Sequence, residues 1–96
     1  MNAVIGAKPT PKKLAAARVP AQFDVQWCDP LGDWQPCHGG VGQRLIAPGQ
    51  EALETLMRAL LREHRNGKFV VRATVTSFQT GRPLVAYSTI GPRCTR

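Results

Sequence analysis

The sequence predicts a small α+β domain in which one helix packs on one face of a mainly antiparallel sheet. Between Pro48 and Gly67, apolar residues recur at intervals of three and four, which is the period of an amphipathic helix. From Lys68 onward the interval changes to two, which is the period of a strand with one buried face. A helix with a single apolar side packs against a single partner surface, and the strands around it supply such a surface.

The predicted helix has an apolar side and a polar side. The apolar side comprises Leu53, Leu56, Met57, Leu60, Leu61 and His64, and the polar side comprises Glu51, Glu54, Thr55, Arg58, Arg62 and Arg65. Acids in the first turns and arginines in the last suit the helix dipole, and Glu54 is spaced to pair with Arg58. Pro48 suits the first helical turn, and Asn66-Gly67 predicts a left-handed stop.

A hairpin is predicted after the helix, with strands over 68–78 and 83–90. Residues 79–82 form the turn between them, in which Gly81 supplies a positive φ. If residues 80 and 81 are a two-residue loop, the pairs on the helix-covered face are Val71 with Ile90, Val75 with Ala86, and Ser77 with Leu84. The outer, half-wet face then carries Arg72, Thr74, Thr76, Val85, Tyr87 and Thr89.

Short strands are also predicted before the helix, over 23–28, 34–38 and 43–47. Residues 29–33 form a turn by composition, and Pro36 confines the second strand to a sheet edge or a bulge. The register of this first hairpin stays open, because one more loop residue reverses which side chains face inward. The glycines of 39–42 favour a flexible connector over a phosphate-binding loop, because the Gly-Lys-Ser/Thr ending is missing. The element order is therefore β-β-(β)-α-β-β, with the third strand optional.

Residues 1–20 are predicted to be a flexible, disordered basic arm, followed by a single domain over 21–96. The arm carries Lys8, Lys12, Lys13 and Arg18 with no acidic residue. It lacks the apolar bulk that would offset the entropy of ordering. The net charge of +7 divides into +4 in the arm and +3 in the domain, where nine basic residues face six acidic ones.

This charge distribution favours an anionic partner, so the leading hypothesis is a non-catalytic module that contacts DNA, RNA or a nucleoprotein. Candidate contacts are Lys8, Lys12, Lys13 and Arg18 of the arm, Arg72 and Tyr87 of the outer sheet face, and Arg58, Arg62 and Arg65 of the helix. An aromatic ring beside a guanidinium can stack a base and hold a phosphate. Both patches have a structural alternative: Tyr87 as a cross-strand partner of Thr74, and the helix arginines as complements of the dipole.

A second hypothesis is a protein-binding inhibitor or adaptor, or a homodimer, that acts through the open sheet face or a strand edge. A small domain with two tryptophans, here Trp27 and Trp34, often exposes one of them at an interface. Small size and a loose basic end are typical of accessory proteins of phages and mobile elements, although no motif identifies one.

A third hypothesis, a small enzyme that uses cysteine and histidine, is disfavoured by the sequence. Neighbouring Cys37 and His38 would point to opposite faces of a strand, and His64 fits a packed residue near the helix end. Asp29 and Asp33 bracket a turn as turn-forming residues do. We therefore expect no catalytic site and no small-molecule substrate.

Cys28, Cys37, His38 and Cys94 are zinc ligands by type, but no two cysteines form a C-x-x-C knuckle, so we expect no metal and no cofactor. A disulfide between Cys28 and Cys37 across their turn is geometrically conceivable.

Three cysteines without a secretion signal nevertheless favour reduced thiols and a cytoplasmic protein. No apolar stretch is long enough to span a membrane.

Overall fold

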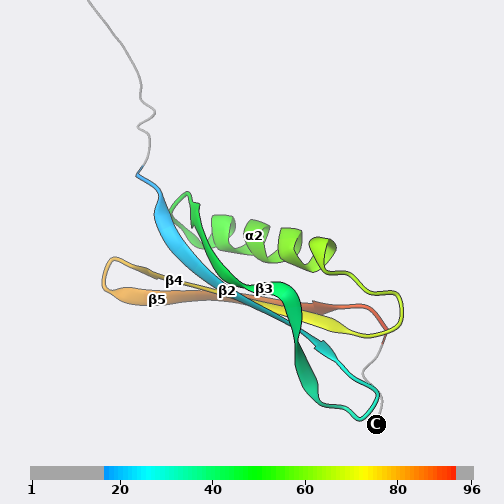
Figure 1. Ribbon diagram of the computed structural model, residues 1–96. Coiled ribbons are helices and arrows are strands. Elements are labelled where there is room, and N and C mark those ends of the chain that lie inside the picture. The colour runs from blue at the N-terminus through cyan, green and yellow to red at the C-terminus, as the bar shows by residue number, and fades with distance from the viewer. Residues whose placement is uncertain (1–16, 93–96) are drawn as a thin grey trace, which may run out of the picture.

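Residues 17–92 of the chain are described by the computed structural model, in which one helix lies on one face of a four-stranded sheet (Figure 1). The elements in chain order are β2 (Val19–Cys28), β3 (Trp34–Ile46), α2 (Gln50–Glu63), β4 (Val71–Gln79) and β5 (Arg82–Ile90). The strands lie in the order β3-β2-β4-β5, and every neighbouring pair is antiparallel. The predicted α+β architecture is confirmed, and the optional third strand is the second half of β3.

The hydrophobic core fills the space between α2 and the sheet. The helix contributes its apolar stripe, Leu53, Leu56, Met57, Leu60 and Leu61, each at most 7% exposed. Alternate strand residues face this stripe, and the fully buried ones include Ala21, Val25, Val71, Ala73 and Val75. Burial of one leucine side chain contributes about 2 kcal/mol, so this layer supplies much of the driving force for folding.

The β4–β5 hairpin has the register that the sequence predicts. Its pairs include Val71 with Ile90, Val75 with Ala86, and Ser77 with Leu84. Thr80 and Gly81 form the two-residue loop, and both have positive φ, 49° and 79°. These angles belong to a type I′ turn, whose twist matches that of the flanking strands. Because a β-branched residue is strained at positive φ, Asn or Gly would suit the turn better than Thr80 does.

The helix is shorter than the predicted 48–67, and its start is made differently. α2 begins at Gln50 after an N-cap at Gly49, so Pro48 lies before the helix and not in its first turn. The Gly49 N–H donates to Oε1 of Gln79 at 2.9 Å. This hydrogen bond ties the start of the helix to the end of β4.

The helix ends at Glu63, without the left-handed glycine stop that we expected. His64 caps it, and the His64 backbone N–H donates to a carbonyl of the last turn at 3.1 Å. Gly67 has no positive φ. Instead, Oδ1 of Asn66 accepts the backbone N–H of Lys68 at 2.8 Å, and this side-chain turn redirects the chain toward β4.

β3 is a single bent strand at one edge of the sheet, where we predicted two short strands and a connector. The residue pairs on either side of a register shift are Asp24 with Val41 and Gln26 with Pro36. Residues 37–40 of β3 therefore lie opposite Val25 alone, which makes a large β-bulge. The strand turns sharply along its length (Figure 1), and the prediction that Pro36 lies on an edge strand is confirmed.

Two glycines in and beside this bulge, Gly40 and Gly42, are closely packed against β2. A Cβ on Gly40 would lie 2.7 Å from the carbonyl oxygen of Val25, and one on Gly42 would lie 2.8 Å from the Phe23 ring. Backbone and ring approach these positions so closely that glycine alone fits without a shift. The interpretation of residues 39–42 as a flexible connector is wrong for this reason.

β2 begins inside the segment that we assigned to the arm. Val19 and Pro20 are its first residues, and the Pro20 carbonyl accepts the Ser77 hydroxyl at 2.7 Å. Three predicted arm contacts lie outside the described residues: Lys8, Lys12 and Lys13. Among the described residues, no helix is long and apolar enough to cross a membrane.

Candidate functional site

One side of the sheet is covered by α2, and the other is uncovered; we call the uncovered side the open face. It includes Gln22, Asp24 and Gln26 of β2, Val41 and Gln43 of β3, Arg72, Thr74, Thr76 and Phe78 of β4, and Val85 and Tyr87 of β5. Most of these residues line a shallow hollow of about 740 Å³. The outer face predicted for the β4–β5 hairpin is confirmed, and β2 and β3 extend it.

Arg72 is held at one end of the open face by two neighbours. Its Nε and Nη2 donate to Oε1 of Gln26 at 3.0 and 2.7 Å. Its guanidinium carbon lies 4.0 Å from the centre of the Trp34 ring, which is a cation–π contact. The ring beside the guanidinium is therefore Trp34, whereas the sequence suggested Tyr87. Trp34 was missed because its position depends on the register of the first hairpin, which the sequence leaves open.

Tyr87 is 71% exposed and lies opposite Thr74 in the sheet, which is the cross-strand position considered above. It lines the hollow together with Arg72, and Asp24 is the acidic residue of that lining. Since the charges of Asp24 and Arg72 cancel, the open face has little net charge with which to attract a polyanion.

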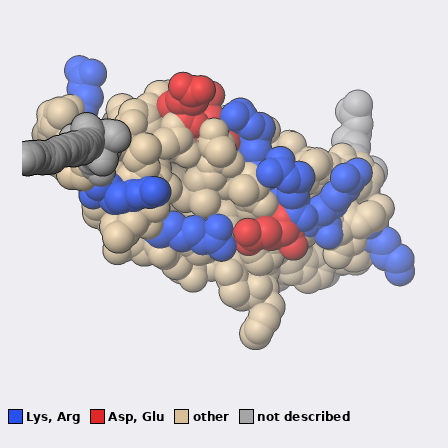
Figure 2. Space-filling model, turned by 90° about the horizontal axis from the view of Figure 1, so that it is seen from above, with Lys and Arg blue, Asp and Glu red and all other residues tan. Residues whose placement is uncertain are grey.

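Basic side chains gather on the helix side of the molecule, as Figure 2 shows. We call four exposed residues of this side the arginine face: Arg44, Arg58, Arg62 and Arg65. Arg44 forms an ion pair with Glu63 at 3.3 Å, and its guanidinium lies 5.3 Å from the centre of the Phe23 ring. Arg44 therefore links the edge strand β3 to the end of α2.

The other three arginines of this face, Arg58, Arg62 and Arg65, have no ion-pair partner among residues 17–92. The predicted pair between Glu54 and Arg58 is not formed, and Glu54 instead accepts a hydrogen bond from Gln50 at 3.4 Å. Arg62 lies in the last turn of α2, where it complements the negative end of the helix dipole, and Arg65 follows the end of the helix rather than lying on it as predicted. All three guanidiniums are available to an anionic ligand.

A second, smaller pocket of about 300 Å³ lies between the β3 bulge and the end of α2. Its lining is Trp27, Cys37, His38, His64, Asn66, Phe69 and Val71. The bulge brings Cys37 and His38 to the same pocket as His64, which sequence spacing could not reveal. Burial, together with the charge of Asp24, raises the pKa of the Cys37 thiol. A nucleophilic cysteine is usually activated by a lowered pKa, so the shift at Cys37 runs in the opposite direction.

The cysteines differ in state. Cys37 is a free thiol, so the disulfide considered between Cys28 and Cys37 does not form. Cys28 is disulfide-bonded, and the expectation of reduced thiols is wrong for this residue. Cys94 lies outside the described residues. In the part of the chain that the structure describes, no group of three or more His, Cys, Asp or Glu side chains could hold a metal ion.

Asp29 organises the turn between β2 and β3, as its position predicted. Its Oδ1 accepts the backbone N–H groups of Leu31 and Asp33, each at 2.9 Å, and its Oδ2 accepts the Gln35 amide at 2.9 Å. These hydrogen bonds, led by the one from the Asp33 backbone, lower the pKa of the Asp29 carboxyl. The Asp29 carboxylate therefore holds the turn together and joins it to the start of β3.

Comparison of this chain with protein-family models finds no match. No curated protein and no solved structure matches it either. A functional proposal for this chain therefore rests on the chemistry of the two sides of its sheet.

Proposed function

We propose that this protein is a non-catalytic recognition module that contacts a nucleic acid, free or within a nucleoprotein, through its arginine face and its basic N-terminal residues. The supporting observation is the separation of charge between the two sides of the sheet. The helix side carries exposed guanidiniums without carboxylate partners. The open face, in contrast, carries Arg72 held by Gln26 and balanced by Asp24.

The first described residues lie on the same side as the arginine face. Arg18 lines a groove between β3 and α2 together with Arg44 and Thr55. The basic residues that precede it in the sequence are Lys8, Lys12 and Lys13. A chain that leaves from Arg18 starts beside the arginine face, so one polyanion can engage both groups of charges.

Contacts of this kind recognise the phosphate backbone and not the base sequence, because guanidinium and ammonium groups make charge-assisted hydrogen bonds to phosphate oxygens. Each neutralised phosphate releases a counterion, so affinity falls steeply with salt. Arg58, Arg62 and Arg65 together with three arm lysines give about six contacts, which corresponds to a slope of log affinity against log salt of about −4 to −5.

Fluorescence anisotropy of labelled duplex and single-stranded oligonucleotides, measured at increasing salt, tests the proposal. We expect Arg62→Ala to weaken binding and to reduce the slope by about one. Arg82→Ala is the matched control, because Arg82 is an exposed arginine that pairs with Gln79 near the start of α2, at the opposite end of the helix from Arg62. Arg62→Lys keeps the charge and most of the affinity. Absence of salt-dependent binding to either oligonucleotide at low ionic strength would overturn the proposal.

The location and the lack of catalysis are separate parts of the proposal. A cytoplasmic location stays a prediction, and the disulfide-bonded Cys28 counts against it because disulfides are uncommon there. Catalysis through the small pocket is disfavoured by the raised pKa of Cys37. Cell fractionation tests the cytoplasmic location. Nucleic-acid binding retained by a Cys37→Ala/His64→Ala variant supports the lack of a catalytic role for the small pocket.

A further inference from the structure

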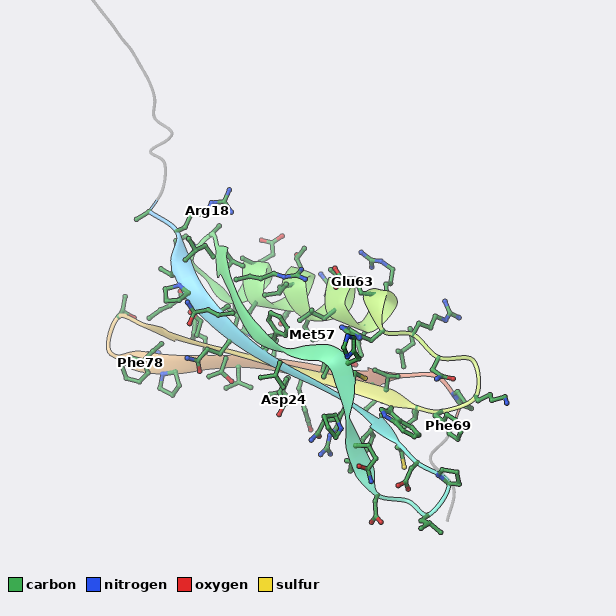
Figure 3. The ribbon with its side chains drawn as sticks, in the orientation of Figure 1. Arg18, Asp24, Met57, Glu63, Phe69 and Phe78 are labelled. Carbon is green, nitrogen blue, oxygen red and sulfur yellow. The ribbon has the colours of Figure 1, made fainter. Side chains whose placement is uncertain are left out.

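We propose that a second copy of this chain covers the open face, in a symmetric dimer whose two helices lie on the outside. Four large side chains of this face meet solvent: Val41, Phe78, Val85 and Tyr87 are 69%, 69%, 50% and 71% exposed. In Figure 3, Phe78 and Asp24 project from the side of the sheet away from α2. Aromatic and aliphatic groups exposed together on one face mark an interaction surface.

Charge favours a second copy over a nucleic acid as the occupant of this face. The chain carries a net charge of +7, so two copies repel each other wherever their basic surfaces meet. The open face holds one acidic residue, Asp24, and one basic residue, Arg72. Two open faces can therefore approach without net repulsion, while the arginine faces stay on the outside.

The strand register makes the open face complementary to itself. One row of its residues runs across the sheet from Val41 of β3 through Asp24 and Thr74 to Tyr87 of β5. A two-fold axis parallel to the strands, between β2 and β4, places β2 over β4 and β3 over β5 of the second copy. Val41 then lies over Tyr87 of the second copy, and the acid Asp24 lies beside Arg72 of the second copy.

The area of the open face suits a weak dimer. The four strands are about 4.8 Å apart, and same-face residues along each strand are about 7 Å apart. Four such residues on each of four strands cover roughly 500 Å² on each copy. The two faces together reach about 1,000 Å², which is the low end of specific interfaces. Because glutamine and threonine side chains line much of the hollow, we expect a dissociation constant on the order of 10 µM.

Sedimentation velocity of the full chain from about 1 to 300 µM tests this arrangement. We expect the wild-type protein to pass from monomer to dimer over this range. Tyr87→Asp should raise the dissociation constant at least about tenfold, because it would bury a carboxylate without a partner. Leu31→Asp is the matched control, since Leu31 is 77% exposed in the turn between β2 and β3, and it should leave dimerisation unchanged.

Three results would contradict the proposal. The wild-type protein could stay monomeric throughout the range, or a dimer could form that Tyr87→Asp leaves intact. In the third case, Tyr87→Asp abolishes nucleic-acid binding without changing sedimentation, which would assign the open face to the nucleic acid. Circular dichroism of the variants establishes that each is folded before these comparisons are made.

Cross-linking tests the position of the two-fold axis with milder substitutions. Val41→Cys and Tyr87→Cys proteins, both in a Cys37→Ser background, are mixed and treated with a short bis-maleimide. In one copy, positions 41 and 87 are three strand spacings apart, roughly 14 Å, and two copies of position 41 are similarly far apart in the proposed dimer. We expect cross-linked dimer from the mixture and little from either variant alone. Equal cross-linking within a single variant, or none in the mixture, would rule this axis out.

Discussion

Arg72 and the helix arginines differ in how firmly their side chains are held. Hydrogen bonds to Gln26 and the contact with Trp34 fix the Arg72 guanidinium before any partner arrives. Immobilising a long side chain on binding costs about 0.5–1.5 kcal/mol of free energy. Because Arg72 is already immobilised in the folded chain, a partner that binds it would not incur this loss. Arg58 and Arg62 have no ion-pair partner among the described residues, and they lose their freedom when they bind a phosphate. The open face is thus preorganised to a degree that the arginine face is not.

Cys37 is expected to react slowly with electrophiles. Burial, and to a smaller extent the Asp24 carboxylate, hold the pKa of its thiol above its usual range. Since the thiolate is the reactive form, the rate of iodoacetamide alkylation should rise with pH at a higher midpoint than for an exposed cysteine. Asp24→Asn should move this midpoint only partway back, because burial remains. Peptide mass spectrometry over a pH series measures both midpoints, and a wild-type midpoint at or below that of an exposed cysteine contradicts the expectation.

Among the elements, the bulge of β3 depends most on a single residue. Gly40→Ala would place a methyl group 2.7 Å from the carbonyl oxygen of Val25, and no side-chain rotation relieves this contact. We expect the free energy of unfolding to fall by about 1–3 kcal/mol. Gly67→Ala is the control, because its Cβ would meet nothing within 4 Å, and it should change stability by less than about 0.5 kcal/mol. Urea titration compares the two variants, and equal stabilities would mean that the bulge relaxes without cost.

The elements that the sequence predicts well are those defined by local signals. The apolar stripe of α2 and the two-residue loop at Thr80 and Gly81 each involve neighbouring residues, so the helix and the β4–β5 register follow from them. The first hairpin contains a bulge whose position depends on the close packing of Gly40 against β2. This packing is a tertiary contact, so local sequence signals do not reveal it. The position of Trp34, and with it the surroundings of Arg72, depends on that hairpin. The sequence therefore predicted the guanidinium of the open face but not the ring beside it.

For the whole molecule, the sheet separates two surfaces with different chemistry. The helix side presents unpaired guanidiniums, and the open face presents apolar and amide groups with balanced charge. The net charge of the sequence indicated an anionic partner, but it could not say which side of the sheet would carry the charge. That assignment needed the pairing of Arg72 with Gln26 and of Arg44 with Glu63.

Replacing three arm lysines by glutamine in the full chain tests how much the charge of the N-terminal arm contributes to nucleic-acid binding. The variant is Lys8→Gln/Lys12→Gln/Lys13→Gln. We expect the salt slope of nucleic-acid binding to fall by about two to three, because up to three phosphate contacts are lost. The temperature of thermal unfolding should stay unchanged, since the substitutions leave the core between α2 and the sheet intact. An unaltered slope would show that these lysines contact no phosphate.

A strand at the border of a sheet is a template on which another chain can add a strand. β3 interrupts this template, because its bulge breaks the continuous row of backbone donors and acceptors. The other border, β5, stays regular over Arg82–Ile90, and Pro83 removes one N–H donor near its start. Ordered aggregates of this protein would therefore grow from one margin only, which makes β5 the strand to protect in concentrated solutions.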